Sequence, residues 1–255
     1  MARQHQIVVT THCPLFVDRA HIESNIIVSG SKARPAKSTA EIRTVLGVRA
    51  SDNLTHANWV LIVEGESDSR ALRALFTIES ASLRSSLRNA HLVIDHLWGA
   101  GKLSYKLTEL RNMLCGLHVF LDNDDSGRRA TEKAQKDGLL KPLDLHLATC
   151  PGKKHSEWED LLLPDLYGDW VQTTYGVALK RPSFQNQKPW SERMSDTFHA
   201  NGKPWTDRIK TEVKTHLSEL VEQQPASALN PAIRSAFDSL KTALEQKVSA
   251  KSANA

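Results

Sequence analysis

Two clusters of acidic residues each follow directly on an apolar run of the sequence. The run 59–63 (WVLIV) leads into 64–68 (EGESD), and the run 117–121 (LHVFL) leads into 122–126 (DNDDS). Runs of about five aliphatic residues that polar residues end abruptly are typical of buried strands in a parallel sheet. Ligands of open α/β sheets bind beyond the carboxyl ends of the strands, where these acids are expected to lie.

The two clusters predict a metal site if their strands are neighbours in the sheet. Carboxylates that converge raise one another's pKa and oppose folding unless a cation neutralises them. Hard oxygen ligands favour Mg²⁺ or Mn²⁺ over zinc, and there are enough acids for two ions about 4 Å apart. Ser126 is expected to add a hydroxyl or a water-mediated ligand. The carboxylates concerned are Glu64, Asp68, Asp122, Asp124 and Asp125.

Helix capping competes with metal binding as an explanation for some of the acids. Asp125 is placed to cap a helix that starts at Ser126, so both roles stay open for it. A third acidic run, 157–160 (EWED), follows the last predicted strand. The helix macrodipole alone favours acids in a first turn, so this run does not by itself indicate a metal ligand.

The acids are positioned by a predicted α/β fold with a parallel sheet flanked by helices. Apolar runs alternate with segments of helical periodicity, which implies right-handed crossovers and a sheet covered on both faces. Beyond Tyr167 helical signals dominate and predict a helical subdomain at 167–250, followed by a disordered tail at 251–255. The strands are expected at 59–63, 91–95, 117–121 and 143–148, and the helices at 67–80, 103–114, 126–137, 207–222 and 231–248.

The N-terminal segment contains one more strand signal. Residues 6–11 (QIVVTT) predict a buried strand that runs into His12, Cys13 and Pro14. This order resembles the last strand and switch histidine of ABC-type ATPases; an ordinary edge strand and loop is the alternative. The sequence contains no GxxxxGK[ST] phosphate loop, so we expect no nucleotide to bind this chain alone. Residues 29–38, rich in Lys, Arg and Ser, are predicted to form a flexible connection.

The acidic motifs resemble those of the TOPRIM domain, which topoisomerases, primases and several nucleases share. The resemblance rests on Val63-Glu64-Gly65, on Asp68, and on Asp122-Asn123-Asp124. Together with the Thr-Thr-His-x-Pro segment, the order of motifs is similar to that of the OLD (overcoming lysogenisation defect) family, including the Gabija nuclease subunit. Members join an ABC ATPase to a TOPRIM nuclease. The resemblance is weak over 6–20, good over 57–165 and suggestive at 202–205.

This resemblance implies a domain order and a set of roles. Residues 1–55 would be the tail of an ATPase module with a linker, 56–166 the TOPRIM domain and 167–250 a helical region. Glu64 and Asp122 would be catalytic metal ligands, and Glu157 or Glu159 would hold a second ion. Lys203, in Gly202-Lys203-Pro204-Trp205, would offset charge on the reacting phosphate, with Lys188 of a short repeat (188–194 and 203–209) as its substitute. A solvated surface lysine is the alternative for Lys203.

Composition favours a cytoplasmic protein that acts on a polyanion. Lys and Arg number 33 against 29 acids, and no apolar run approaches the roughly 18 residues of a membrane span. None of the three cysteines belongs to a CxxC motif, which favours reduced thiols. Basic surface around an acidic pocket suits DNA, with non-specific phosphate contacts. The candidate contacts are Lys102, Arg128, Arg129, Lys133, Lys136, Lys153, Lys154 and Lys188.

The protein is predicted to be a DNA endonuclease that uses two metal ions. It is expected to work with an ABC-type ATPase, fused or separate, and to form a homo-oligomer through that ATPase. Two alternatives remain open. One is a TOPRIM strand-passage or primase-type module. The other is a DNA-binding regulatory module with a structural metal site. Strand passage needs a nucleophilic tyrosine on a partner domain, and no basic motif surrounds Tyr105, Tyr167 or Tyr175.

Overall fold

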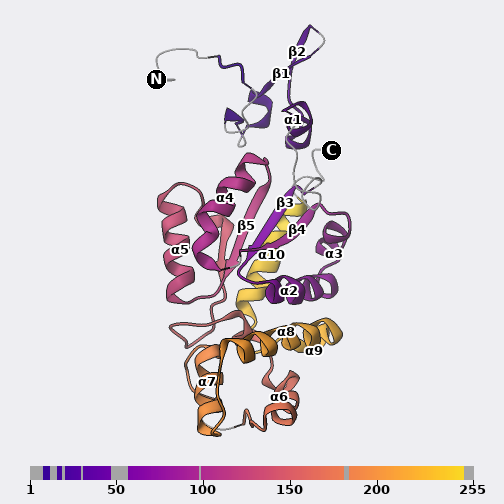
Figure 1. Ribbon diagram of the computed structural model, residues 1–255. Coiled ribbons are helices and arrows are strands. Elements are labelled where there is room, and N and C mark those ends of the chain that lie inside the picture. Colours follow the sequence, from indigo (N-terminus) through magenta and orange to yellow (C-terminus); the bar gives the residue numbers. More distant parts are fainter. Residues whose placement is uncertain are drawn as a thin grey trace.

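The centre of the protein is a four-stranded parallel sheet with the strand order β4-β3-β5-β6 (Figure 1). The computed structural model describes residues 8–11, 16–18, 21–29, 31–46, 57–97, 99–180 and 184–249. The strands are β3 (Trp59–Val63), β4 (Leu92–His96), β5 (Gly116–Leu121) and β6 (Leu145–Leu147). The predicted α/β class and all four predicted strands are therefore confirmed. The two strands that lead into the acidic clusters, β3 and β5, are hydrogen-bonded neighbours.

Both faces of the sheet are buried, which explains the uninterrupted apolar runs. Leu61 and Val63 belong to the core on one face, while Val60 and Ile62 belong to the core on the other. This alternation follows from the two-residue side-chain period of a strand. The first face is covered by α2 (Glu66–Glu79) and α3 (Ala81–Arg88), and the second by α4 (Leu103–Asn112) and α5 (Asp125–Lys136).

The C-terminal helices share a core with the first face of the sheet. Helix α8 packs on α2, and α10 packs on α3 and β6, with Phe76 and Phe237 stacked at 5.4 Å between ring centroids. The helices expected within 167–250 are thus present, but α8 and α10 are part of the same hydrophobic core as the sheet. In Figure 1, α6 to α9 lie below the sheet and α10 runs along it. They are α6 (Gly168–Tyr175), α7 (Trp190–Ala200), α8 (Asp207–Gln223), α9 (Pro225–Ala228) and α10 (Ser235–Ser249).

The N-terminal region differs from its prediction in two ways. Val8 and Val9 are 81% and 58% exposed and lie outside any strand, so a buried strand at 6–11 is wrong for its described part. A strand needs a neighbouring ladder, and the described residues provide none there. The predicted flexible connection at 29–38 instead contains β2 (Lys32–Pro35), which pairs with β1 (Ile26–Ser29) ahead of α1 (Thr39–Leu46). His12 lies outside the described residues.

This hairpin and α1 form a small core of their own against the sheet domain. Ile27, Ala36 and Ile42 are buried there together with Leu114, which follows α4. Within the described ranges, no helix is long and apolar enough to cross a membrane. Of the three cysteines, Cys115 and Cys150 are buried and belong to no disulfide, and Cys13 is outside the described residues.

A buried pair of histidines joins the sheet to α10. His118 on β5 is 1% exposed, and its Nε2 lies 2.8 Å from Nδ1 of His146 on β6. The other nitrogen of His146 lies 3.0 Å from Ser239 Oγ on α10. Burial, then the nearby Lys247 ammonium, lowers the pKa of His118 to about 3. The same causes lower the pKa of His146. Both imidazoles are therefore neutral at pH 7.

We expect this pair to make the protein sensitive to acid. The unfolded chain binds a proton at His118 near pH 6.5, whereas the folded chain resists protonation down to about pH 3. The free energy of unfolding should therefore decrease by up to about 1.4 kcal/mol per pH unit as pH falls below 6.5. In urea titrations between pH 7 and pH 5, His118→Gln should show a shallower slope. Replacement of the exposed His199 by Gln is the control; an equal slope in wild type and His118→Gln would contradict the assignment.

Candidate metal centre

Three loops bring acidic residues together at the carboxyl edge of the sheet. Glu64 follows β3, and Asp122 follows β5, its hydrogen-bonded neighbour. The third loop comes after β6 and turns back beside the second, because Asn123 and Ser156 exchange backbone hydrogen bonds of 2.8 and 3.1 Å. This bridge places Glu157 and Glu159 at the same edge of the sheet as Glu64, which follows β3, and Asp122, which follows β5.

Asp122, Glu157 and Glu159 form the tightest group. Each offers a carboxylate oxygen, and the three oxygens lie within 4.8 Å of one another. Asp122 Oδ1 accepts a hydrogen bond of 2.8 Å from the backbone N–H of Trp158, which fixes it beside the third loop. Such a spacing suits a small cation that several oxygens share.

The pKa values of the acids are raised by their surroundings. Burial, followed by the charges of Asp124 and Asp68, raises the pKa of Glu64. Burial also raises the pKa of Asp68 and, well above its usual range, that of Asp122. The pKa of Glu159 rises to about 7, again mainly through burial. The structure therefore places the predicted acids of all three loops within one another's electric field.

One cation of the chain itself already lies in this cluster. Lys214 Nζ, on α8, is 2.7 Å from Glu159 Oε1 and 3.6 Å from Glu157 Oε2. The surrounding carboxylates, Glu159 first, hold the pKa of Lys214 well above its usual range despite its burial. Lys214 is not among the site residues predicted from the sequence. A signal was present, because Lys214 falls on the helical face of the buried Leu217 and Val221.

Two of the predicted ligands also close helix ends. Asp68 Oδ2 accepts a 2.8 Å hydrogen bond from the N–H of Gly65, at the start of α2. Asp124 Oδ1 accepts one of 2.7 Å from the N–H of Gly127 and is the N-cap of α5. The predicted capping role of Asp125 is therefore wrong. Asp125 is the first residue of the helix, with a side chain that is 76% exposed.

Position 127 requires glycine for steric reasons. A Cβ atom at this position would lie 2.3 Å from the carbonyl oxygen of Asp122. The absence of a side chain therefore lets the first turn of α5 approach the end of β5, which holds Asp122 and Asp124 beside each other.

Glu157 is held by the N-terminus of α7. Its Oε1 accepts a hydrogen bond of 3.1 Å from the N–H of Ser191, and its Oε2 accepts one of 2.7 Å from Ser191 Oγ. Glu159 has no such partner for Oε2, which is buried without a hydrogen-bond donor within the described part of the chain. Of the two candidates for the second ion, Glu159 therefore has the freer oxygen.

A buried aspartate fixes the loop that carries these two glutamates. The side chain of Asp160 is fully buried, and its Oδ1 lies 2.8 Å from Lys153 Nζ and 2.5 Å from an Arg193 guanidinium nitrogen. Its Oδ2 accepts hydrogen bonds from the N–H groups of Glu157 and Trp190, at 2.9 and 3.2 Å. Asp160 therefore joins the loop to α7 and has all its lone pairs engaged, so it is not available to a metal.

The acidic cluster fits a divalent cation on grounds that the chain itself supplies. Glu64 Oε2, like Glu159 Oε2, is buried and lacks a hydrogen-bond partner among the described residues. Buried polar atoms are nearly always paired, so orphaned carboxylate oxygens indicate a missing partner. The donor set consists of carboxylate oxygens, which suits Mg²⁺ or Mn²⁺.

Several predicted DNA contacts have structural partners instead. The side chain of Lys153 is 10% exposed, and its Nζ lies 2.8 Å from Asp160 Oδ1, so a phosphate contact by this ammonium stays a prediction. Arg128 donates to Asn123 Oδ1 and to the carbonyl of Lys154, at 3.0 and 2.8 Å. Lys188 forms an exposed ion pair of 2.7 Å with Asp196. Of these residues, Arg128 and Lys153 stabilise the loop that contains Lys154 and Asp160.

The remaining predicted residues lie on the surface. Lys203 is exposed, and its side chain lies near Gly176. The lysine in contact with the acids is thus Lys214, and a catalytic role for Lys203 stays a prediction. Lys102 is exposed on the short helix Ala100–Lys102. Ser126 is exposed and lines a hollow of about 280 Å³ with Ser104 and Arg129, and its role as a metal ligand stays a prediction.

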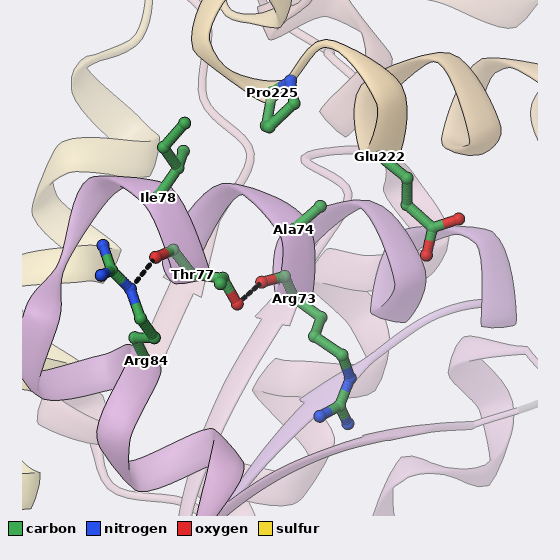
Figure 2. A pocket seen from close by; sticks show the side chains of 7 residues that line it. All are labelled: Arg73, Ala74, Thr77, Ile78, Arg84, Glu222 and Pro225. Atoms are coloured by element: carbon green, nitrogen blue, oxygen red, sulfur yellow. Dashed lines mark hydrogen bonds between the residues drawn. The ribbon is translucent and has the colours of Figure 1, made fainter.

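A larger hollow, of about 670 Å³, lies away from the acidic cluster. It opens beside α2 and α9, where Arg84 Nε donates to the carbonyl oxygen of Thr77, near Ile78 and Pro225 (Figure 2). None of the residues of the acidic cluster lines it. The acidic residues predicted from the sequence gather at the sheet edge and not at this hollow. A scan against protein-family models and a search of curated proteins both find no match to this chain.

Proposed function

We propose that the protein is a metal-dependent DNA endonuclease that uses Mg²⁺ or Mn²⁺. The observation that supports this most is the gathering of acids from three loops at one sheet edge, where Glu64 and Glu159 have buried oxygens without a hydrogen-bond partner in the described part of the chain. The resemblance of the motifs to the TOPRIM nucleases of the OLD family points to the same chemistry. An ABC-type ATPase partner and a phage-defence setting belong to this proposal.

The residues of the chain would divide the work as follows. Asp122, Glu157 and Glu159 would hold one ion, and Glu64, Asp68 and Asp124 would hold or orient a second. Divalent ions in such a site polarise a phosphodiester and make bound water nucleophilic at neutral pH. Asp160 and the Asn123–Ser156 bridge keep the third loop in register with the second. Before a metal binds, Lys214 contributes positive charge beside the acids.

A specific observation also favours the non-catalytic alternative. Lys214 already neutralises part of the cluster, so the fold does not need a metal to offset every carboxylate. In that case the cluster would be a buried ionic network in a DNA-binding module. Buried ion pairs of this kind need not stabilise a fold strongly, which makes the distinction an experimental one.

We expect the purified protein to nick or linearise supercoiled plasmid only when Mn²⁺ or Mg²⁺ is present. The rate should fall to background in excess EDTA and return when Mn²⁺ is restored. Gel electrophoresis of plasmid forms over time measures this. A protein that melts at a higher temperature in Mn²⁺ but leaves the plasmid intact would favour the regulatory module. Because members of the family that it resembles join the nuclease to an ATPase, plasmid cleavage should be measured with and without ATP.

A further inference from the structure

We infer that Lys214 and the divalent metal are alternative counter-ions of the same carboxylates, so that metal binding expels the Lys214 ammonium from between Glu157 and Glu159. This rests on the proposed function, because it assumes that a metal binds the cluster. It adds an order of events: the metal-free site is held by an internal ion pair that the metal must break. Nothing in the sequence motifs assigns this role.

The Lys214 ammonium lies among the carboxylates that would hold the metal. Lys214 Nζ lies 2.7 Å from Glu159 Oε1 and 3.6 Å from Glu157 Oε2, and these two residues with Asp122 form the tightest acidic group. A Mg²⁺ ion held by Glu159 Oε1 at about 2.1 Å would lie within about 4.8 Å of Nζ. Two cations that close repel each other and compete for the same oxygen lone pairs. The present place of the ammonium is thus part of the volume the metal would use.

The Lys214 side chain can move away from these carboxylates toward solvent. Its side chain is 21% exposed, compared with 1% for Glu159 and 10% for Glu157. Lysine carries its charge on a flexible four-carbon stem, so the ammonium can move while the backbone of α8 stays in place. The Lys214 ammonium also lies over the ring of Trp190, 5.6 Å from its centroid. Among the described residues, no backbone carbonyl accepts a hydrogen bond from it.

The two glutamates depend on Lys214 to different degrees. Glu157 keeps Ser191 as a partner if Lys214 leaves, whereas Glu159 has Lys214 as its ion-pair partner and an Oε2 without a hydrogen-bond donor among the described residues. Glu159 is therefore the residue that exchanges one cation for the other. The exchange makes the metal-free fold stable without closing the site to metal.

Lysine acylation followed by mass spectrometry tests this on the whole protein without DNA. The protein is pulsed with an acetylating reagent in EDTA and in saturating Mn²⁺, with the exposed Lys136 as the internal reference. We expect Mn²⁺ to accelerate modification of Lys214 roughly tenfold relative to Lys136. A tenfold change is expected if about one-tenth of the Lys214 side chains are outside the ion pair in EDTA and all of them are outside it in Mn²⁺. Metal binding itself is measured separately, from the Mn²⁺-induced shift in melting temperature.

Each outcome decides one question. If Mn²⁺ shifts the melting temperature and Lys214 becomes more reactive, the exchange is supported. If Mn²⁺ shifts the melting temperature but Lys214 reacts at the same rate or more slowly, the exchange is wrong and the proposed metal site survives. If Mn²⁺ neither binds nor alters labelling, the proposed function and this inference both fail.

A variant provides a second readout. Glu159→Gln removes the charge that holds the ammonium, so Lys214 should react rapidly even in EDTA, and Mn²⁺ should no longer change its rate. The matched control is Glu219→Gln, an exposed glutamate on the same helix as Lys214. Slow modification of Lys214 in the Glu159→Gln protein in EDTA would contradict the role of Glu159 as its partner.

Discussion

Replacing Asp122 by Asn should lower Mn²⁺-dependent plasmid cleavage by more than about 100-fold, because a ligand that positions a catalytic metal accounts for several kcal/mol of transition-state stabilisation. Asp122 contributes to the tightest acidic group and is fixed by the N–H of Trp158. Asparagine keeps an oxygen for that hydrogen bond but loses the negative charge. The rate of conversion of supercoiled to nicked plasmid measures the effect, and Glu64→Gln should behave in the same way.

The same substitution should leave the metal-free protein at least as stable as the wild type. Burial raises the pKa of Asp122, so at pH 7 its ionised form opposes folding, and this cost increases as pH rises above the value for an unfolded aspartate. A neutral amide removes that cost. Urea unfolding in EDTA should therefore show an unchanged or higher free energy of unfolding for Asp122→Asn. Lost cleavage without lost stability distinguishes a functional acid from a structural one.

Asp125→Asn is the matched control for this prediction. Asp125 is the first residue of α5, three residues after Asp122, and its side chain is 76% exposed. The Asp125→Asn protein should cleave plasmid at a rate within a few-fold of the wild-type rate. Normal cleavage by both Asp122→Asn and Glu64→Gln would place the active site elsewhere and remove the basis of the proposed nuclease.

Replacing Asp160 by Ala should destabilise the protein by about 3–5 kcal/mol, the cost of removing one partner from a buried ion pair. The side chain of Asp160 is fully buried and faces both Lys153 and Arg193, whose side chains are each only 10% exposed. Without the carboxylate these two positive charges would be buried beside each other, and the N–H groups of Glu157 and Trp190 would lose an acceptor. Urea unfolding monitored by tryptophan fluorescence measures the loss.

The Asp160 variant should also bind metal poorly, because the loop that carries Glu157 and Glu159 loses its anchor to α7. Asp165→Ala, an exposed aspartate five residues further along, should change the free energy of unfolding by less than about 0.5 kcal/mol. A loss below about 1 kcal/mol for Asp160→Ala would mean that Lys153 and Arg193 find other partners or reach water.

The sequence was sufficient to predict the four strands of the parallel sheet and the acids that follow β3 and β5. A five-residue apolar run such as 59–63 is a local signal, and a residue that follows a strand must lie at the edge of the sheet. The neighbouring position of β3 and β5 was a condition of the metal-site prediction, and the strand order satisfied it. The signal failed at 6–11, where an apolar run lies outside any strand with Val8 and Val9 exposed. A strand exists only where another strand accepts its hydrogen bonds, and sequence periodicity does not report that.

Only the tertiary structure identified the cation among the acids. Lys203 has a glycine, a proline and a tryptophan beside it and was the more conspicuous lysine, but it lies on the surface, whereas Lys214 contacts Glu157 and Glu159. The same holds for Asp160, whose partners Lys153 and Arg193 come from separate segments of the chain. The sequence by itself determined which residues carry charge and which strand ends carry the acids, because both are local properties. Which charges meet was decided by how α7 and α8 pack against the sheet, since Coulomb interactions depend on distance in space and not on distance along the chain.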